Sequence, residues 1–342
     1  MEARQADALP DGPAWQFEPK WDGFRAIAIR NGGRAELYGK SGKPLGRYFP
    51  EILARLIAAR PKRFAVDGEI AIERNGGSSF EALQARLHPA QSRIEKLSRE
   101  MPAVLILFDA LMSEEEPMLW QRPLAERRDA LERLFLQLKP TGGFRLSPAT
   151  TSRATAQKWL KRAGGGSLDG VVAKARTDPY RFGDRAMVKV KCLRTADCVV
   201  GGFRYQSGPR LVGSLLLGLY DAHGLLHHVG FTSGIRDEER KPLTRRLEAL
   251  RSAPGFTGSA PGGPSRWSTE RSAEWEPLKP ELVVEVRYDH VTGDRFRHGT
   301  KFLRFRPDIA PRACTFAQLH REESPRRLEA TLIGKTAQRN RS

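Results

Sequence analysis

The sequence predicts a mixed α+β domain followed by a small all-β barrel that carries one helix. The chain has 342 residues, which is enough for two domains of ordinary size. Up to about residue 193, apolar runs typical of strands alternate with segments of helical periodicity. Beyond that point the strand-like runs are short and separated by glycines, and a single helical segment lies among them. This change predicts a domain boundary near residue 193.

The first 193 residues contain the elements of the α+β domain. Short runs of apolar residues predict strands at residues 25–30, 34–38, 64–72, 104–111, 170–175 and 186–191. Apolar residues at helical spacing predict helices at residues 50–59, 123–138 and 154–163. In the second of these helices, one face collects Leu124, Leu131, Leu134, Phe135 and Leu138. Pro123 suits the first turn of that helix.

The rest of the chain predicts the barrel and a tail. Strands are expected at residues 199–205, 212–220, 225–231 and 282–288. One helix is expected at residues 241–251, with Pro242 in its first turn, and a loop rich in Gly, Pro and Ser at residues 258–265. This pattern fits a small barrel of the oligonucleotide-binding type. We therefore divide the chain into residues 1–193, a barrel at 194–319 and a basic tail at 320–342, which we expect to be frayed.

The composition favours a nucleic-acid partner. The chain has 58 Lys and Arg residues against 40 Asp and Glu residues, a formal net charge of +18. Such an excess creates a field that attracts polyanions, and nucleic acid is the usual polyanionic partner of a basic chain. A uniformly solvated basic surface has the same composition, so charge alone does not decide between the two.

No segment predicts membrane insertion or secretion. No run approaches the roughly 18 apolar residues of a membrane span, and the first residues, MEARQADALPDG, lack the apolar centre of a signal peptide. Cys192, Cys198 and Cys314 form neither a disulfide framework nor a CxxC zinc site. We therefore expect a cytoplasmic protein, and we expect it to be a monomer.

Lys20 lies in the stretch EPKWDGFR, where a strand is expected to begin. A lysine acts as a covalent nucleophile only as the neutral amine, which burial or neighbouring cations favour. Trp21 can shield the amine, Gly23 lets the backbone approach a ligand closely, and Arg25 supplies a fixed cation. A solvated surface lysine is the more common case, so the pattern needs support from the rest of the chain.

Further motifs on successive predicted strands supply that support. They are Glu69 in FAVDGEIAI, Phe108 in ILFDAL, Asp169 and Lys174 in LDGVVAKA, and Lys189 and Lys191 in MVKVK. A spacing of two places Lys189 and Lys191 on the same side of a strand. Each motif alone is also compatible with a solvated strand end. Their order along the chain favours one shared site.

Together these motifs resemble those of the covalent nucleotidyltransferases, the superfamily of DNA ligases, RNA ligases and mRNA capping enzymes. The strongest resemblance is to bacterial ATP-dependent DNA ligases tied to end joining and to small primase-polymerases. It covers nearly the whole chain, through the phrases EPKWDGFR, YFPEI, VDGEI, FEALQARLHPA, VGGFRYQSG and DRFRHGTKFLRFRPD. It implies an adenylating nucleotidyltransferase domain of antiparallel sheets with flanking helices, followed by an OB-fold barrel.

The resemblance also implies roles for individual residues. Lys20 corresponds to the lysine that attacks the α-phosphate of ATP and keeps AMP as a phosphoramidate, and Glu69 and Asp169 correspond to ligands of Mg²⁺ or Mn²⁺. The other implied nucleotide contacts are Glu18 and Phe108 at the adenine, Arg25 and Glu69 near the ribose, and Lys40, Lys174, Lys189 and Lys191 at the phosphates. The residues implied to orient the pyrophosphate from the barrel are Arg304, Arg306 and Asp308.

The implied function is an ATP-dependent DNA ligase of DNA repair and recombination that seals nicks in duplex DNA. Its candidate protein partners are a small primase-polymerase and end-joining factors. An RNA ligase, a capping-type guanylyltransferase and a nick-binding relic without turnover are the alternatives. The departures from the family pattern are Asp169 for a glutamate, Lys40 for an arginine, Met187 for a tryptophan and Ile309 for a lysine. The last of these bears on the adenylation step.

Overall fold

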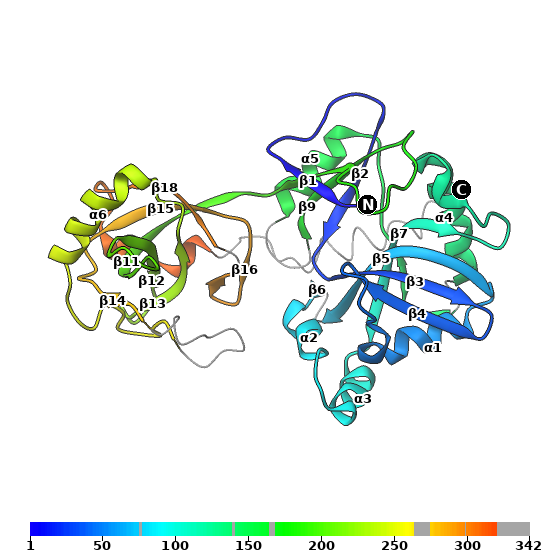
Figure 1. Cartoon of the computed structure of the whole chain (residues 1–342), viewed down its shortest axis with the longest axis horizontal. Helices are drawn as coiled ribbons and strands as arrows, with labels where there is room; N and C mark the ends of the chain where they lie inside the picture. The colour runs from blue at the N-terminus through cyan, green and yellow to red at the C-terminus, as the bar shows by residue number, and fades with distance from the viewer. Residues whose placement is uncertain (75–76, 139–140, 164–167, 263–273, 298, 320–342) are drawn as a thin grey trace. The chain divides into compact units, whose positions relative to one another are not determined.

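The computed structural model describes residues 1–319 apart from residues 75–76, 139–140, 164–167, 263–273 and 298. The predicted basic tail therefore lies outside the described residues. The described residues form two compact units that divide between Cys192 and Leu193. Figure 1 labels the elements of each unit. Each unit has its own apolar core.

The larger sheet of the N-terminal unit is six-stranded and mostly antiparallel (Figure 1). Its strands in spatial order are β4 (Arg34–Gly39), β3 (Phe24–Asn31), β5 (Arg63–Arg74), β7 (Ala103–Met112) and β8 (Phe144–Leu146), with β6 (Gly77–Ser78) paired to β5. The β7–β8 pair is parallel and the other pairs are antiparallel. On β3 the alternating residues Ala26 and Ala28 are buried, as expected for a sheet with one face on a core.

Two helices share one apolar core with this larger sheet. They are α1 (Pro50–Ala58) and α4 (Leu124–Leu138), and three of the leucines predicted to form one face of α4, Leu131, Leu134 and Leu138, are buried there. Pro123 directly precedes α4, where its missing N–H breaks no helical hydrogen bond. The shorter helices α2 (Phe80–Ala85) and α3 (Gln91–Glu100) connect β6 to β7.

The smaller sheet of this unit is four-stranded and includes Lys20. Its order is β1 (Ala3–Ala6), β10 (Met187–Lys191), β9 (Leu168–Ala175) and β2 (Trp15–Trp21), and helix α5 (Arg153–Arg162) packs against it. The strand expected after Lys20 is present as β3, but Lys20 itself lies inside another strand, β2, which was not predicted. Pro19 conceals this strand in the sequence. Proline is tolerated because β2 is at the edge of the sheet, where a missing N–H costs no ladder bond.

The C-terminal unit is built on one antiparallel sheet. Its strands in spatial order are β13 (Leu226–Thr232), β12 (Val212–Tyr220), β11 (Arg194–Tyr205), β15 (Val283–Tyr288) and β18 (Lys301–Phe305). β14 (Glu276–Pro277) pairs with β11, and β16 (Val291–Thr292) and β17 (Arg295–Phe296) form a separate hairpin. Helix α6 (Asp237–Ala249) buries Leu243 and Leu247 in the core of this unit.

The sheet of the C-terminal unit curls so that its two edges meet. The N–H of Thr300 donates to the carbonyl of Phe231 at 3.2 Å, and the hydroxyl of Thr232 donates to the carbonyl of Thr300 at 2.9 Å. The expectation of an OB-like β domain is confirmed. The described strands are joined at these edges by an isolated bridge and do not form a closed ring of ladders.

The helix of the C-terminal unit is longer than predicted. It begins at Asp237, so Pro242 lies inside it and not in its first turn. Acidic residues in the first turn favour the earlier start, because they interact with the positive end of the helix dipole. The loop predicted at residues 258–265 is described only as far as residue 262, and residues 258–262 are free of helix and strand.

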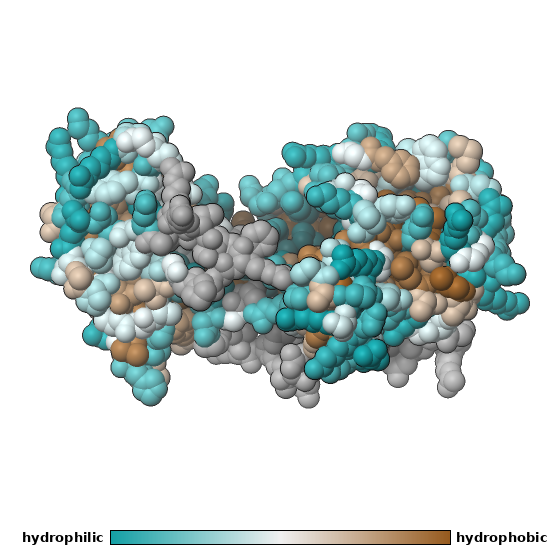
Figure 2. Space-filling model, turned by 60° about the horizontal axis from the view of Figure 1, so that its bottom comes forward, coloured by the Kyte–Doolittle hydropathy of each residue, from teal (hydrophilic) through white to brown (hydrophobic). Residues whose placement is uncertain are grey.

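Figure 2 colours one face of the molecule by hydropathy. The face drawn in Figure 2 is hydrophilic over most of its described area, in keeping with the net charge of +18. Within the described part of the chain, no helix combines the length and the apolar character needed to cross a bilayer.

His228 on β13 is a buried histidine whose surroundings disfavour its charged form. It is 5 % exposed, and its Nδ1 lies 3.0 Å from Nη2 of Arg295. Burial, with Arg295 and Arg204 nearby, lowers the pKa of His228 from the ordinary 6.5 to about 3, and a backbone hydrogen bond at Gly230 opposes this only in part. Folded His228 therefore stays neutral at pH values where an unfolded histidine is charged.

The free energy of unfolding of the C-terminal unit should fall as the pH drops from 6.5 toward 3, because the unfolded chain binds a proton that the folded unit does not. His228→Phe keeps a ring against Phe256 and removes this titration, so its stability should fall less over the same range. Urea unfolding of both proteins at several pH values checks this. The carboxylates titrate alike in the parent and in His228→Phe. An equal fall in the free energy of unfolding with pH in the two proteins would therefore contradict the prediction.

Candidate active site

Lys20 is placed beside Asp169 by the antiparallel pairing of β2 with β9. Lys20 lies opposite Gly170 in that pairing, and its Nζ is 2.7 Å from Oδ2 of Asp169. The lysine side chain is 24 % exposed and the aspartate 6 %. Gly170 is required here, because a Cβ would lie 2.1 Å from the backbone oxygen of Val190 on β10. The pairing of three strands therefore holds the amine in an ion pair that solvent still reaches.

Two more lysines lie near Lys20. Nζ of Lys191 lies 4.0 Å from Oδ2 of Asp169. Burial, followed by the charges of Lys20 and Lys191, lowers the pKa of Lys189. Both residues are partly exposed on β10 while the residues beside them are buried, so they share one side of the strand as their spacing predicts. We call Lys20, Lys189 and Lys191 the lysine cluster.

Glu69 on β5 approaches the lysine cluster from the larger sheet. One of its carboxylate oxygens accepts a hydrogen bond of 3.0 Å from the N–H of Gly23. Desolvation raises the pKa of Glu69 to about 8, and the charges of Lys20 and Arg25 oppose this rise. Gly23 is needed for this contact, because a Cβ there would lie 2.2 Å from the backbone oxygen of Ile70.

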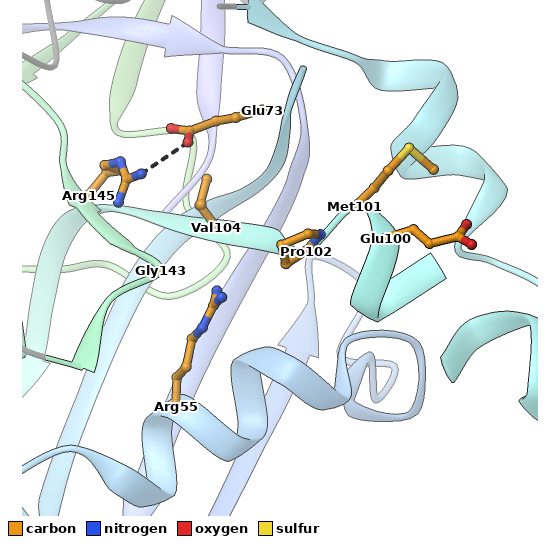
Figure 3. Close-up of a pocket in the computed structure, with 8 residues that line it drawn as sticks. All are labelled: Arg55, Glu73, Glu100, Met101, Pro102, Val104, Gly143 and Arg145. Atoms are coloured by element: carbon orange, nitrogen blue, oxygen red, sulfur yellow. Dashed lines mark hydrogen bonds and ion pairs between the residues drawn. The ribbon is translucent and has the colours of Figure 1, made fainter. Parts of the chain in front are cut away.

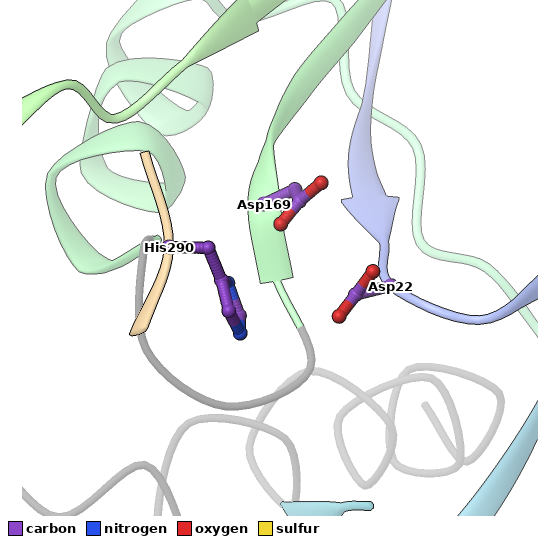
Figure 4. Close-up of side chains that lie close together, drawn as sticks. All are labelled: Asp22, Asp169 and His290. Atoms are coloured by element: carbon purple, nitrogen blue, oxygen red, sulfur yellow. The ribbon is translucent and has the colours of Figure 1, made fainter. Parts of the chain in front are cut away.

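Asp22 is a second carboxylate next to Asp169, and the sequence analysis gave it no role. A carboxylate oxygen of Asp22 lies within 4.8 Å of one of Asp169 (Figure 4). The charge of Asp22 also contributes to the raised pKa of Glu69. Hard carboxylate oxygens are the ligands that Mg²⁺ and Mn²⁺ prefer, so this donor set fits a divalent cation. Asp22 is the aspartate of the K-x-D-G pattern around Lys20, so this pattern could have singled it out in the sequence.

The residues predicted to contact the adenine lie together between the two sheets. Oε2 of Glu18 on β2 and Nζ of Lys174 on β9 form a buried ion pair of 2.7 Å. Nζ of Lys174 also lies 4.6 Å from the ring centroid of Phe108 on β7 and donates to its carbonyl at 3.3 Å. Lys174, for which the resemblance implies a phosphate contact, is thus beside Glu18 and Phe108 in this structure.

Arg25 is fixed by two residues that the sequence analysis did not single out. Its Nε and Nη2 donate to the two carboxylate oxygens of Asp67 at 3.1 and 2.6 Å. The hydroxyl of Tyr180 donates to Oδ2 of Asp67 at 2.6 Å, and both residues are buried. This orientation leaves the guanidinium carbon 5.8 Å from the ring centroid of Phe108. Asp67 and Tyr180 therefore aim Arg25 at the predicted adenine position.

Lys40 lies at the rim of the site. Its side chain is 63 % exposed and pairs with Glu2 at 3.3 Å. An exposed pair of this kind contributes little to stability. Lys40 is close enough to contribute to the lowered pKa of Lys189, so a phosphate contact from the rim is compatible with its position.

The three residues predicted to act from the second domain lie together in the C-terminal unit. Nε and Nη2 of Arg306 donate to the carboxylate of Asp308 at 3.0 and 2.8 Å, and Nε of Arg304 donates to Glu285 at 2.7 Å. The hydrogen bond from Arg306 lowers the pKa of Asp308 to about 2. Ile309, which replaces a family lysine, packs against the apolar core.

A separate cavity of about 580 Å³ lies elsewhere on the N-terminal unit (Figure 3). The residues that line it are Arg55, Glu73, Glu100, Met101, Pro102, Val104, Gly143 and Arg145. None of the predicted site residues is among them. Two arginines, Arg55 and Arg145, line the cavity. Arg145 is paired with Glu73 at 3.0 Å, so the charge of this arginine is neutralised. The residues predicted to act on ATP therefore do not line this cavity.

The candidate site contains a partly exposed lysine, Lys20, among cations and carboxylates. It lies in a unit of two sheets, which is followed by an OB-like unit. Together these features define a two-domain nucleotidyltransferase. Comparison with family models gives the particular family. Residues 5–191 match the ATP dependent DNA ligase domain, and residues 208–309 match the ATP dependent DNA ligase C terminal region. The chain therefore belongs to the ATP-dependent DNA ligase family.

Individual relatives agree with this result. The chain is 43 % identical over 334 residues to DNA ligase C2 of Mycolicibacterium smegmatis, covering 93 % of each chain. It is 42 % identical over 336 residues to DNA ligase C of Mycobacterium tuberculosis, covering 94 % of this chain and 93 % of the relative. A solved structure from a study of Lig E DNA ligases is 17 % identical, with a TM-score of 0.55 over 90 % of this chain and 100 % of that one, and supports the fold.

Proposed function

We propose that this enzyme seals nicks in duplex DNA with ATP and that Lys20 carries the AMP between steps. The observation that supports this assignment most directly is the position of Lys20, whose amine lies 2.7 Å from Asp169 and beside Lys189 and Lys191. The family supports the overall reaction. The match of EPKWDGFR to the lysine motif supports the choice of nucleophile.

In the first step, the neutral amine of Lys20 attacks the α-phosphorus of ATP. An N–P bond forms, the bond to the bridging oxygen of pyrophosphate breaks, pyrophosphate leaves with that electron pair, and the nitrogen gives up one proton to solvent. Lys189 and Lys191 lie on the side of β10 that faces Lys20, where their charges stabilise negative charge on the phosphate oxygens. Phe108 offers its ring to the adenine.

The later steps transfer the AMP and join the strands. An oxygen of the 5′-phosphate at the nick attacks the phosphorus of the lysyl-AMP, which forms an anhydride and returns the N–P electron pair to Lys20. The 3′-hydroxyl then attacks the 5′-phosphate, a phosphodiester bond forms, and AMP leaves. The basic surface attracts the duplex through its phosphates, independently of sequence.

A divalent cation is part of the proposal, since phosphoryl transfer needs charge neutralisation. Asp22 and Asp169, with Glu69 close by, would hold Mg²⁺ or Mn²⁺. When bound, the cation supplies Lewis-acid polarisation of the phosphate oxygens. The contact between Lys20 and Asp169 keeps the nucleophile next to these carboxylates.

We also propose a cellular setting and a movement. The segment at residues 192–196 would let the C-terminal unit present Arg304 and Arg306 to the pyrophosphate in the first step and hold DNA in the later ones. The setting is DNA repair by end joining, with a small primase-polymerase as partner. The resemblance in the sequence supports both statements.

Labelled nucleotides test the reaction. The protein is incubated with α-labelled ATP or GTP and a divalent metal, and is then given nicked DNA or nicked RNA. We expect label from ATP on the protein, stable to alkali and labile to acid, and sealing of nicked DNA. Label from GTP, or sealing of RNA alone, would point to the capping or RNA-ligase alternatives. Binding of nicked DNA without any label would point to a relic.

Asp169→Glu tests the carboxylate that departs from the family pattern. We expect this variant to keep or increase nick sealing, because a longer carboxylate can still pair with Lys20 and reach a cation beside Asp22. Asp169→Asn, which has the same shape without the charge, should lose sealing. Sealing rates over a range of Mg²⁺ concentrations check this. Complete loss in a folded Asp169→Glu protein would mean that the site is built around the shorter side chain.

A further inference from the structure

We propose that Asp197 is a positioning residue for the adenylation step, because it fixes the orientation of Arg306. The inference rests on the proposed function, in which Arg306 orients the pyrophosphate of ATP. Nη1 of Arg306 donates to Oδ1 of Asp197 at 2.9 Å, and the two residues are 109 positions apart in the chain. Sequence spacing therefore gives no hint of the contact.

The contact is produced by the strand order of the C-terminal unit. Asp197 on β11 is the direct cross-strand partner of Glu285 on β15, and Glu285 is the partner of Arg304 on β18. Side chains of directly opposed residues lie on the same face of a sheet. The neighbours of Asp197 in β11, Ala196 and Cys198, point into the core. Asp197 therefore belongs to a polar row that crosses three strands outside the core.

Arg306 stands at the end of this row and is held by acidic groups on two sides. Asp308 accepts from its Nε and Nη2, Asp197 accepts from its Nη1, and Glu285 lies 3.8 Å from the same Nη1. A guanidinium has five N–H donors. The hydrogen bonds described above use one N–H on each of the three nitrogens of Arg306. One N–H on Nη1 and one N–H on Nη2 are left to bind a phosphate.

Asp308 alone cannot fix this geometry. It lies two residues from Arg306 on the same segment after β18, and its side chain is 61 % exposed. The N–H of Arg306 donates to the carbonyl of Val283 on β15 at 2.8 Å, which holds the backbone of Arg306 on the sheet but does not orient its guanidinium. Asp197 differs because it lies on β11, whose backbone is bonded to β12 and β15 on either side. The bond from Arg306 to Asp197 therefore ties the guanidinium to the sheet.

The expected consequence is limited to one step. Pyrophosphate leaves in the adenylation of Lys20 and is absent when a pre-adenylated nick is sealed. A misplaced Arg306 should therefore slow adenylation and leave the sealing of pre-adenylated nicks unchanged. A merely structural role for Asp197 would weaken both reactions together.

The test measures both reactions for full-length variants. Asp197→Ala should reduce the single-turnover rate of adenylation by about 10- to 100-fold, the cost of misplacing a positioning group. Sealing of pre-adenylated nicked DNA should stay within about twofold of the parent. Asp197→Glu should restore part of the adenylation rate. Gln318→Ala is the matched control, because the side chain of Gln318 bonds the backbone of Asp197 and the carbonyl of Thr315 but not the carboxylate of Asp197, so both rates should stay unchanged.

Arg306→Ala separates the failure of this inference from the failure of the proposed function. If Arg306→Ala slows adenylation and Asp197→Ala does not, Asp197 has no positioning role. If Arg306→Ala leaves adenylation unchanged, the proposed role of Arg306 itself is wrong. If the inference holds, Asp197→Ala combined with Arg306→Ala is no slower than Arg306→Ala alone, since the two residues then act as one unit.

Discussion

The Lys20→Ala protein is expected to gain no AMP when it is mixed with ATP and a divalent metal, and its nick sealing should fall by at least about a thousandfold. The reason is that we expect no other amine to take the place of Lys20. Nζ of Lys191 is also close to Asp169, at 4.0 Å, but Lys191 lies on β10 and not on β2. Intact-protein mass spectrometry measures the bound nucleotide. Affinity for duplex DNA should change little, because one charge is a small part of a net +18.

Lys20→Arg is the matched control for the nucleophile. Arginine keeps the positive charge beside Asp169, but its guanidinium stays protonated and does not attack phosphorus. Lys20→Arg should therefore be as inactive in adenylation as Lys20→Ala. Both variants should still join a nick that already carries AMP, because that step does not use the amine. AMP on either variant would mean that another residue is the nucleophile.

The motifs of the sequence and their resemblance to a known family were sufficient to single out candidate residues for the site, and the roles of these residues stay a prediction. Lys20, Glu69, Phe108 and Asp169 were found in this way, and their strands bring them close together in space. The alternation of Lys189 and Lys191 on β10 followed from strand geometry alone. These predictions depend only on local pattern.

The residues that orient those groups were not predictable from local pattern. Tyr180 reaches Asp67 across 113 residues, and Asp197 reaches Arg306 across 109. Such contacts depend on which strands are neighbours and on their register, and a single sequence does not contain that information. Strand β2 was missed for a related reason. Pro19 reads as a strand breaker unless the strand is known to be at the edge of its sheet.

A buried ion pair in the N-terminal unit is a third contact that only the structure reveals. Nε and Nη2 of Arg127 on α4 donate to the carboxylate of Asp109 on β7 at 2.8 and 3.0 Å. The two side chains are 1 % and 2 % exposed. Nη1 of Arg127 also donates to the carbonyls of Arg122 and Asp178, so the arginine joins the helix, the larger sheet and the segment that leads to Tyr180.

Arg127→Met is expected to lower the free energy of unfolding of the N-terminal unit by about 3–5 kcal/mol, since it leaves Asp109 charged and unpaired in the interior. The loss of the two carbonyl contacts adds to this cost. Urea unfolding followed by tryptophan fluorescence measures it. Arg133→Met, an exposed position on the same helix, is the control and should change stability by less than about 0.5 kcal/mol.

A double variant separates the ion pair from simple packing. Arg127→Met combined with Asp109→Leu removes both charges, so no unpaired charge remains buried, and its cost should be smaller than the sum of the two single costs. Arg127→Met should also lose nucleotide labelling at temperatures where the parent is active, because the segment that holds Tyr180 loses one of its bonds to α4. Additive costs in the double variant would show that the two side chains contribute through packing and not through their charges.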